Sequence, residues 1–228
     1  MISTIVHGSR SGGSAVIAVA FLSRQIAFMA QAPGKPLRIY LIPAEGGSMQ
    51  QPIAGDEDQG DPNWSPDGGS LVFGGQFRPG GDARKNAVRI FHLNTHQISV
   101  VPGSEGLWSP RWSPDGRYLI AMTNDGRKLL AYDFKNPKWT DLAEMPMGYL
   151  QFSHRGEYVY FLATVAGVNS IFRVRLSDHK LEEVNNLKDF HQAPFTVGGW
   201  MGLDPDDAPL LVRDAGTQDI HAITLDLP

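Results

Sequence analysis

The pentapeptide W-S-P-D-G occurs at Trp64–Gly68 and again at Trp112–Gly116, 48 residues later. A degenerate copy, F-S-H-R-G, occupies Phe152–Gly156, and a weaker one, L-D-P-D-D, occupies Leu203–Asp207. Related segments that return at intervals of 40 to 51 residues are typical of propellers and solenoids. The spacing of this motif therefore predicts a repeat architecture such as a propeller or a solenoid.

Each copy of the motif predicts a tight turn between two strands. The serine can bond the backbone two residues on, the proline presets φ, and the glycine accepts the positive φ that closes the turn. The large residue before the turn ends a strand. A β-rich run follows each turn, at residues 71–73, 118–122, 158–162 and 210–212, and residues 26–29 follow a decayed turn at Ser23-Arg24.

Further strands complete each unit. A third strand is expected at residues 38–42, 88–93, 129–134, 171–176 and 220–225, and a fourth at 48–53, 97–101, 139–142 and 181–184. Short strands separated by turn signals, with almost no helical periodicity, exclude a helical fold. The sequence therefore predicts an all-β fold, a β-propeller of about five four-stranded antiparallel blades, as a single domain over residues 1–228.

The fifth unit lacks a fourth strand, and an unpaired sheet edge invites aggregation. The segment I-S-T-I-V-H, at Ile2–His7 within the atypical region 1–22, is rich in β-branched residues and otherwise unassigned. We expect it to join the last blade as its outer strand and to close the ring. A closed ring predicts a monomer, and an open one leaves either an open arc or pairing with a second chain.

The composition limits the possible functions. The formal net charge of −4 and the dispersed basic residues argue against nucleic-acid binding. There are no cysteines, so the chain has no disulfide, thiolate metal site or thiol nucleophile. The apolar run Ala15–Leu22 is too short to span a bilayer, although it leaves a signal peptide as an alternative. We expect a soluble protein without membrane insertion, whose compartment stays open.

The W-S-P-D-G hairpins resemble the repeats of TolB-type propellers, and the resemblance covers about residues 23–228. The run Gly199–Ile220 resembles the propeller modules that end many bacterial sensor proteins. In those proteins a winged-helix or kinase domain and a membrane span precede the propeller, often with the propeller outside the cytoplasm. The resemblance implies a sensory or protein-interaction role. No winged helix, kinase or membrane segment is present in this sequence.

The longer, irregular loops are where binding usually resides on such a scaffold. They are the second-to-third-strand loops and the connections between blades, which emerge on one face. The candidate ligand residues on this face are charged, namely Asp56, Asp58, Arg78, Arg84, Asp125, Arg127, Arg213 and Asp214. They would suit a polar or charged ligand or a protein partner; the alternative is that they are solvated loop charges.

A catalytic alternative starts from G-S-R-S-G at Gly8–Gly12, which matches the G-x-S-x-G pattern of serine hydrolases. Ser9 or Ser11 would be the nucleophile, with His7, His154 or His221 as the base. The motif normally requires a strand, a sharp turn and a helix, and no helix is predicted here. A flexible linker explains the same residues.

Two metal sites are conceivable. Asp56, Asp58 and Asp61 offer the oxygen ligands that calcium prefers, but without the spacing of an EF-hand. His92 and His96 are four residues apart on a predicted strand and its turn, with no third ligand in evidence. We expect no cofactor. The leading hypothesis is a non-catalytic module that binds a protein partner or a small polar ligand, and a hydrolase is the alternative.

Overall fold

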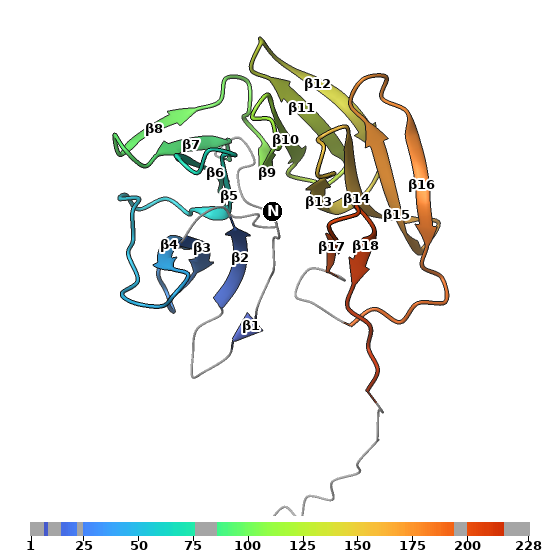
Figure 1. Ribbon diagram of the computed structural model, residues 1–228, viewed down its shortest axis with the longest axis horizontal. Coiled ribbons are helices and arrows are strands. Elements are labelled where there is room, and N and C mark those ends of the chain that lie inside the picture. Colours follow the sequence, from blue (N-terminus) through green and yellow to red (C-terminus); the bar gives the residue numbers. More distant parts are fainter. Residues whose placement is uncertain (1–6, 9–14, 22–24, 76–85, 194–199, 217–228) are drawn as a thin grey trace, which may run out of the picture.

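The computed structural model describes residues 7–8, 15–21, 25–75, 86–193 and 200–216, and every regular element among them is a β-strand. Five antiparallel sheets follow one another along the chain and lie in an arc around a common centre (Figure 1). This confirms the predicted all-β propeller fold.

The sheets contain consecutive strands of the chain. The first holds β1 (His7–Gly8), β2 (Ala15–Phe21), β3 (Gln25–Ala30) and β4 (Arg38–Pro43), and the second holds β5 (Gly60–Trp64), β6 (Ser70–Gly74), β7 (Arg89–His92) and β8 (Gln97–Val100). The third holds β9 (Leu107–Trp112), β10 (Tyr118–Thr123), β11 (Lys128–Asp133) and β12 (Asn136–Glu144). The fourth holds β13 (Met147–Phe152), β14 (Tyr158–Val165), β15 (Val168–Arg175) and β16 (Leu181–Asn186), and the fifth holds β17 (Met201–Leu203) and β18 (Pro209–Leu211) within the described residues.

Strands β5, β9, β13 and β17 lie nearest the centre of the arc, whereas β8, β12 and β16 lie at its outer rim (Figure 1). Each turn of the repeated motif joins an inner strand to the next strand outward. The repeat therefore places equivalent residues of successive blades side by side around the centre.

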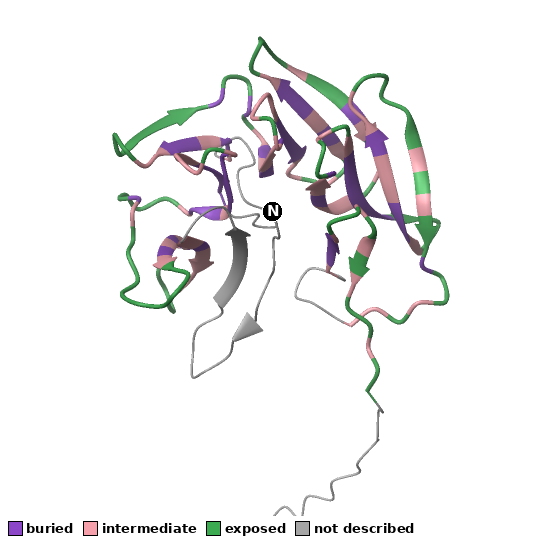
Figure 2. Cartoon of the chain, in the orientation of Figure 1, coloured by how far each residue is buried: buried purple, intermediate pink, exposed green. Residues whose placement is uncertain are grey.

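Among the described residues, four apolar clusters hold the blades together, one between each pair of consecutive sheets. Ile39 of the first sheet shares a cluster with Phe91 of the second, and Val72 of the second shares one with Leu119 of the third. Sheets three and four meet through Ile120 and Phe161, and sheets four and five through Tyr160 and Met201. In Figure 2 the buried residues follow these strands. Burying one such side chain contributes about 1.5–3 kcal/mol, so the sheets are held mainly face to face.

The predicted turn chemistry is present in the first copy of the motif. The N–H of Gly68 donates to the carbonyl of Ser65 at 2.9 Å, and Gly68 has a φ of +71°. The hydroxyl of Ser65 donates to the carboxylate of Asp67 and accepts the N–H of Ser70 at 2.9 Å. The same i to i+3 bond closes the turns that end at Gly116, Gly156 and Asp207.

This turn gives a pH-dependent stability. The Ser65 hydroxyl, followed by the N–H of Gly69, holds the pKa of Asp67 below its ordinary value of 3.8. A lowered pKa in the folded state stabilises the fold at a pH above about 4, and this stability is lost as the pH falls through the folded-state value. We expect Ser65→Ala to raise the pKa of Asp67 in a carboxyl NMR titration and to destabilise the protein at neutral pH by about 1–2 kcal/mol.

Ser153→Ala is the matched control for that experiment. Ser153 occupies the same position of its turn and also accepts a backbone N–H, from Tyr158 at 3.0 Å, but Arg155 stands where the first turn has Asp67. The control variant should lose stability at neutral pH without changing the acid limb of the stability curve. Equal changes of the acid limb in both variants would disprove this account.

Successive turns also contact one another. A Cβ on Gly116 would lie 3.7 Å from the ring of Pro66, and one on Gly156 would lie 3.3 Å from the ring of Pro114. At the next junction His154 replaces the proline and Asp207 replaces the glycine, with a φ of +63°. The Asp207 carboxylate accepts the N–H of His154 at 2.8 Å and lies 2.7 Å from its Nδ1. The two residues that depart from the motif, His154 and Asp207, therefore contact each other.

We expect these two replacements to be energetically coupled. His154→Pro removes both contacts with Asp207 and should destabilise the protein by about 1–2 kcal/mol. Adding Asp207→Gly restores the proline–glycine contact of the other junctions, so the double variant should recover most of that loss. Denaturant unfolding of both single variants and of the double variant measures the coupling. Strict additivity would contradict the pairing.

The structure describes only the end of the N-terminal segment that was predicted to close the ring. Residues 2–6 of the predicted closing strand are outside the described residues, but His7 and Gly8 form β1, which pairs with Val16 and Ala15 of β2. The described end of this segment therefore belongs to the first sheet, not the last. Pairing across a short loop needs far less loop-closure entropy than pairing with the other end of the chain.

Two further strands differ from the expectation. The apolar run Ala15–Phe21, unassigned in the sequence analysis, is β2 and takes the place of the first blade's missing hairpin strand. The fourth strand predicted at residues 48–53 is reduced to a single bridge between Leu41 and Gln50. Gly46 and Gly47, both with positive φ, and Pro52, which lacks an N–H, explain the interruption. The predicted strand at 220–225 lies outside the described residues.

Candidate functional site

Three consecutive inner strands carry a residue with left-handed backbone at the same position. Asp61 in β5 has a φ of +53°, Ser109 in β9 one of +54°, and Tyr149 in β13 one of +56°. Each lies three residues before the large residue that precedes the turn motif. A left-handed conformation is uncommon outside glycine and costs free energy, and such residues are concentrated at functional sites.

A β-bulge produces this conformation in each blade. The register between the inner strand and its neighbour shifts in all three blades. The shift lies between Gly60 and Asn63 in the second blade and between Gly148 and Gln151 in the fourth. In the third blade it lies between Ile120 and Met122 of β10, the strand that pairs with β9. A bulge redirects the side chain that it carries. We call Asp61, Ser109, Tyr149 and the adjacent Arg111 the inner-strand cluster.

Asp61, in the second blade, contacts both the third blade and the first. Its carboxylate accepts a hydrogen bond from the hydroxyl of Ser109, and its Oδ1 lies 3.0 Å from Nη2 of Arg111. Its backbone N–H donates to Sδ of Met29 in the first blade, at 3.2 Å. The side chains of Asp61 and Arg111 are only 19% and 13% exposed. This ion pair is therefore weakly screened by solvent.

The fourth blade contributes Tyr149. Burial, and then the negative charge of Asp61, raise the pKa of the Tyr149 phenol above its ordinary value of 10.0. The phenol therefore stays protonated at neutral pH. The cluster thus combines a carboxylate, a hydroxyl, a guanidinium and a phenol from three adjacent blades, and its formal charges cancel.

Arg111 has further donor capacity. Nη1 donates to the carbonyl of Pro110 at 2.8 Å, and Nη2 faces Asp61. Nε is buried and has no hydrogen-bond acceptor among the described residues. A neutral set of polar groups of this kind suits a ligand that forms hydrogen bonds more than one that brings a net charge.

The acidic loop is tied to the strands beside it. Asp58 accepts the N–H of Leu37 at 2.8 Å, whereas Asp56 is fully exposed and lies 3.6 Å from Arg38. Asp61 instead faces Arg111, so the structure does not bring together the three carboxylates considered for calcium. Over the described ranges, no three His, Cys, Asp or Glu side chains are grouped so that they could hold a metal.

The other candidate ligand residues are spread over separate loops. The carboxylate of Asp125 accepts bonds within its own turn, from the Thr123 hydroxyl and from the N–H of Arg127 at 3.1 Å. These bonds, that from Thr123 foremost, lower the pKa of Asp125. Arg213 and Asp214 are in an extension of β18 that pairs with residues 191–193. Arg78 and Arg84 lie outside the described residues.

The residues of the catalytic alternative do not form a site in the described part of the chain. Ser9, Ser11 and His221 lie outside it, His7 is in β1, and His154 contacts Asp207. The two histidines considered as zinc ligands make different contacts. His92 Nδ1 lies 3.1 Å from the Ser70 hydroxyl, and the His96 ring packs edge-on against Phe91.

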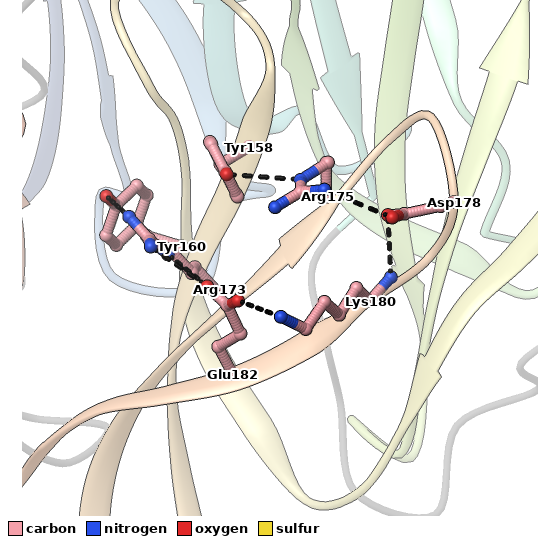
Figure 3. A network of polar contacts seen from close by, with 7 residues as sticks. All are labelled: Tyr158, Tyr160, Arg173, Arg175, Asp178, Lys180 and Glu182. Carbon is pink, nitrogen blue, oxygen red and sulfur yellow. Dashed lines mark hydrogen bonds and ion pairs between the residues drawn. The ribbon is translucent and has the colours of Figure 1, made fainter.

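A second polar cluster covers the fourth blade (Figure 3). Arg173 contacts Glu182 and donates to the Tyr160 hydroxyl at 3.2 Å, and its guanidinium lies 4.4 Å from the Tyr158 ring centre. Arg175 donates to the Tyr158 hydroxyl and to Asp178, both at 3.1 Å. Lys180 pairs with Glu182 at 2.9 Å. Every charged group in this network has an opposite partner, and the network connects β14, β15 and β16.

Comparison with known proteins supports the fold. No family model matches the sequence, and no curated protein matches it. TolB from Acinetobacter baumannii is 15% identical, with a TM-score of 0.69 over 90% of this chain and 56% of that one. A protein described as a TolB of Agrobacterium tumefaciens is 13% identical, with a TM-score of 0.61 over 82% of this chain and 81% of that one. The acylaminoacyl peptidase of Pyrococcus horikoshii is 14% identical, with a TM-score of 0.52 over 78% of this chain and 33% of that one.

These likenesses establish a TolB-like propeller fold. The chain spans little more than half the length of the Acinetobacter TolB, 56%. Because similar propellers occur both in TolB and in a peptidase, the fold alone does not identify the function. None of the described elements is a helix with the length and hydrophobicity needed to cross a bilayer.

Proposed function

We propose that this propeller is a non-catalytic binding module whose inner-strand cluster holds a small polar ligand or a polar segment of a protein partner. One observation carries the proposal. Three successive blades place an acid, a hydroxyl and a phenol in the same costly left-handed conformation, and Asp61 contacts both Ser109 and Arg111. Other non-glycine residues with this conformation lie between strands, at His96, Ala166, His179 and Asp207. In the described part of the chain, the bulges alone repeat it inside successive inner strands, where glycine would adopt it without steric cost, so the polar side chains at these positions favour a functional role.

A ligand screen tests the proposal. The probes are free amino acids, dipeptides and neutral sugars, each assayed by the shift in unfolding temperature that binding produces. A stabilising compound should lose at least about tenfold in affinity, equivalent to about 1.4 kcal/mol, in Tyr149→Phe and in Ser109→Ala. Tyr158→Phe is the matched control, since it removes a phenol hydroxyl from the network on the fourth blade, outside the inner-strand cluster. Equal losses in Tyr149→Phe and Tyr158→Phe would refute the site.

The non-catalytic part is tested separately with a short-chain ester such as p-nitrophenyl acetate. We expect no hydrolysis above the uncatalysed rate. Turnover that disappears in the Ser9→Ala and Ser11→Ala variants would instead establish the serine-hydrolase alternative. A role within a sensor is supported by the resemblance of Gly199–Ile220 alone, and a winged-helix or kinase reading frame directly upstream would support it further.

A further inference from the structure

The outer edge of the second sheet is open. β8 (Gln97–Val100) is the last strand of that sheet, and all four of its residues are exposed (Figure 2). None of the described strands pairs with its second edge. The backbone N–H and C=O groups along an open edge are a template for pairing with another strand.

One side of β8 is apolar. Ile98 lies opposite Phe91 and Val100 lies opposite Arg89, so Ile98 and Val100 continue the side of the sheet that faces the first blade. Phe91 is 2% exposed within the cluster shared with that blade, but Ile98 is 46% and Val100 51% exposed. The apolar face therefore extends past the point at which the first blade covers it.

The first blade leaves this face uncovered because none of its described strands lies outward of β4. The segment at residues 48–53 makes one bridge instead of a strand, and Met49 within it is 56% exposed. The next junction shows the covered arrangement. There Trp139 of β12, opposite Tyr132, donates from Nε1 to the carbonyl of Pro102 at 2.9 Å and lies against Gly103.

Acidic groups lie beside one end of β8. Glu57 Oε2 is 2.9 Å from Nη2 of Arg89, the residue directly opposite Val100. The Glu57 side chain is 79% exposed, and the neighbouring Asp56 is fully exposed. Each carboxylate already faces an arginine, Glu57 facing Arg89 and Asp56 facing Arg38. Because ion pairs of exposed carboxylates are weak, a cation carried by a bound strand near Val100 can share them.

We propose that β8 and the uncovered face beside it bind an extended segment of a partner protein by strand addition. Backbone hydrogen bonds to the β8 edge would supply affinity, and alternate apolar side chains of the partner would cover Ile98 and Val100. A lysine or arginine at one end would face Glu57. A second copy of β8 does not fit this requirement, because the stretch Thr95–Val101 contains no lysine or arginine.

This proposal goes beyond the binding function assigned to the inner-strand cluster, since β8 is at the rim and the cluster is at the centre (Figure 1). The probe is a fluorescein-labelled peptide of sequence TVTVTVKK, with binding to the full chain measured by fluorescence anisotropy. Ile98→Lys should weaken binding about tenfold or more, because it removes apolar contact and repels the basic end. Ser99→Lys is the matched control, since Ser99 carries the same new charge on the opposite face of β8.

Glu57→Gln should weaken the peptide about threefold and reduce the dependence of its affinity on salt. Tyr149→Phe should leave peptide binding unchanged, so failure at the rim and failure at the centre can be told apart. Absence of saturable binding, or equal losses in Ile98→Lys and Ser99→Lys, would overturn the proposal. A dimer in analytical ultracentrifugation that Ile98→Lys dissociates would also overturn it, because the surface would then join two copies of this chain.

Discussion

Replacing Trp64 by alanine is expected to lower the free energy of unfolding by about 3–5 kcal/mol, measured by denaturant unfolding. Trp64 ends the innermost strand of the second blade and is fully buried in the cluster between the first two blades, with Ile39 and Leu71. Removing the indole leaves a large cavity that the rigid sheets can only partly fill. The loss would be a large fraction of the stability of an ordinary domain, about 5–15 kcal/mol.

Trp112, at the same motif position, is the matched control. It is half-buried and stacks on Phe134 with 5.7 Å between ring centres, so Trp112→Ala should cost about half as much. Substitution by phenylalanine sharpens the comparison. Trp64 Nε1 is buried without an acceptor in the described part of the chain, whereas Trp112 Nε1 donates to Gly116 at 3.2 Å. Trp112→Phe therefore loses a hydrogen bond that Trp64→Phe does not. A larger loss from Trp112→Ala than from Trp64→Ala would contradict this account.

The sequence predicted the parts of the fold that depend on local turn chemistry. Ser65, Asp67 and Gly68 form the expected hydrogen-bonded turn, because each residue type favours its own position in it. The reduction of the outer strand at residues 48–53 to one bridge and the pairing of β1 with β2 were not predicted, because they depend on which strand edges compete for the same partner. Propensity within a single segment contains no information about that competition.

The candidate site was predicted only in part. Asp61 was considered, but as a calcium ligand, whereas Ser109, Arg111 and Tyr149 were overlooked. The signal was present, since Asp61, Ser109 and Tyr149 recur at the intervals of the turn motif itself. Three different residue types at one repeat position do not look like a pattern, however. Only the bulged strands show that they share a backbone conformation and meet around the centre of the arc.

Asp61→Ala is expected to destabilise the protein by about 2–3 kcal/mol, because it leaves the largely buried guanidinium of Arg111 without its counter-ion. It also removes the acceptor of the Ser109 hydroxyl. Since the charge of Asp61 helps to raise the pKa of Tyr149, its removal should lower that pKa. The titration of Tyr149 is isolated by subtracting the ultraviolet phenolate titration of the matching Tyr149→Phe protein. Comparing it between the wild type and Asp61→Ala measures the change in pKa.

Asp56→Ala separates the buried charge from an ordinary surface one. Asp56 also faces an arginine, at 3.6 Å, but its side chain is fully exposed, so its loss should cost no more than about 0.5 kcal/mol. Asp61→Asn should fall between the two, because asparagine tolerates the left-handed backbone and still accepts a hydrogen bond while lacking the charge. If Asp61→Ala were as mild as Asp56→Ala, or left the Tyr149 titration unchanged, the second, third and fourth blades would not be coupled through Asp61. The inner-strand cluster would then be a set of separate surface groups, without the rigidity that holding a ligand requires.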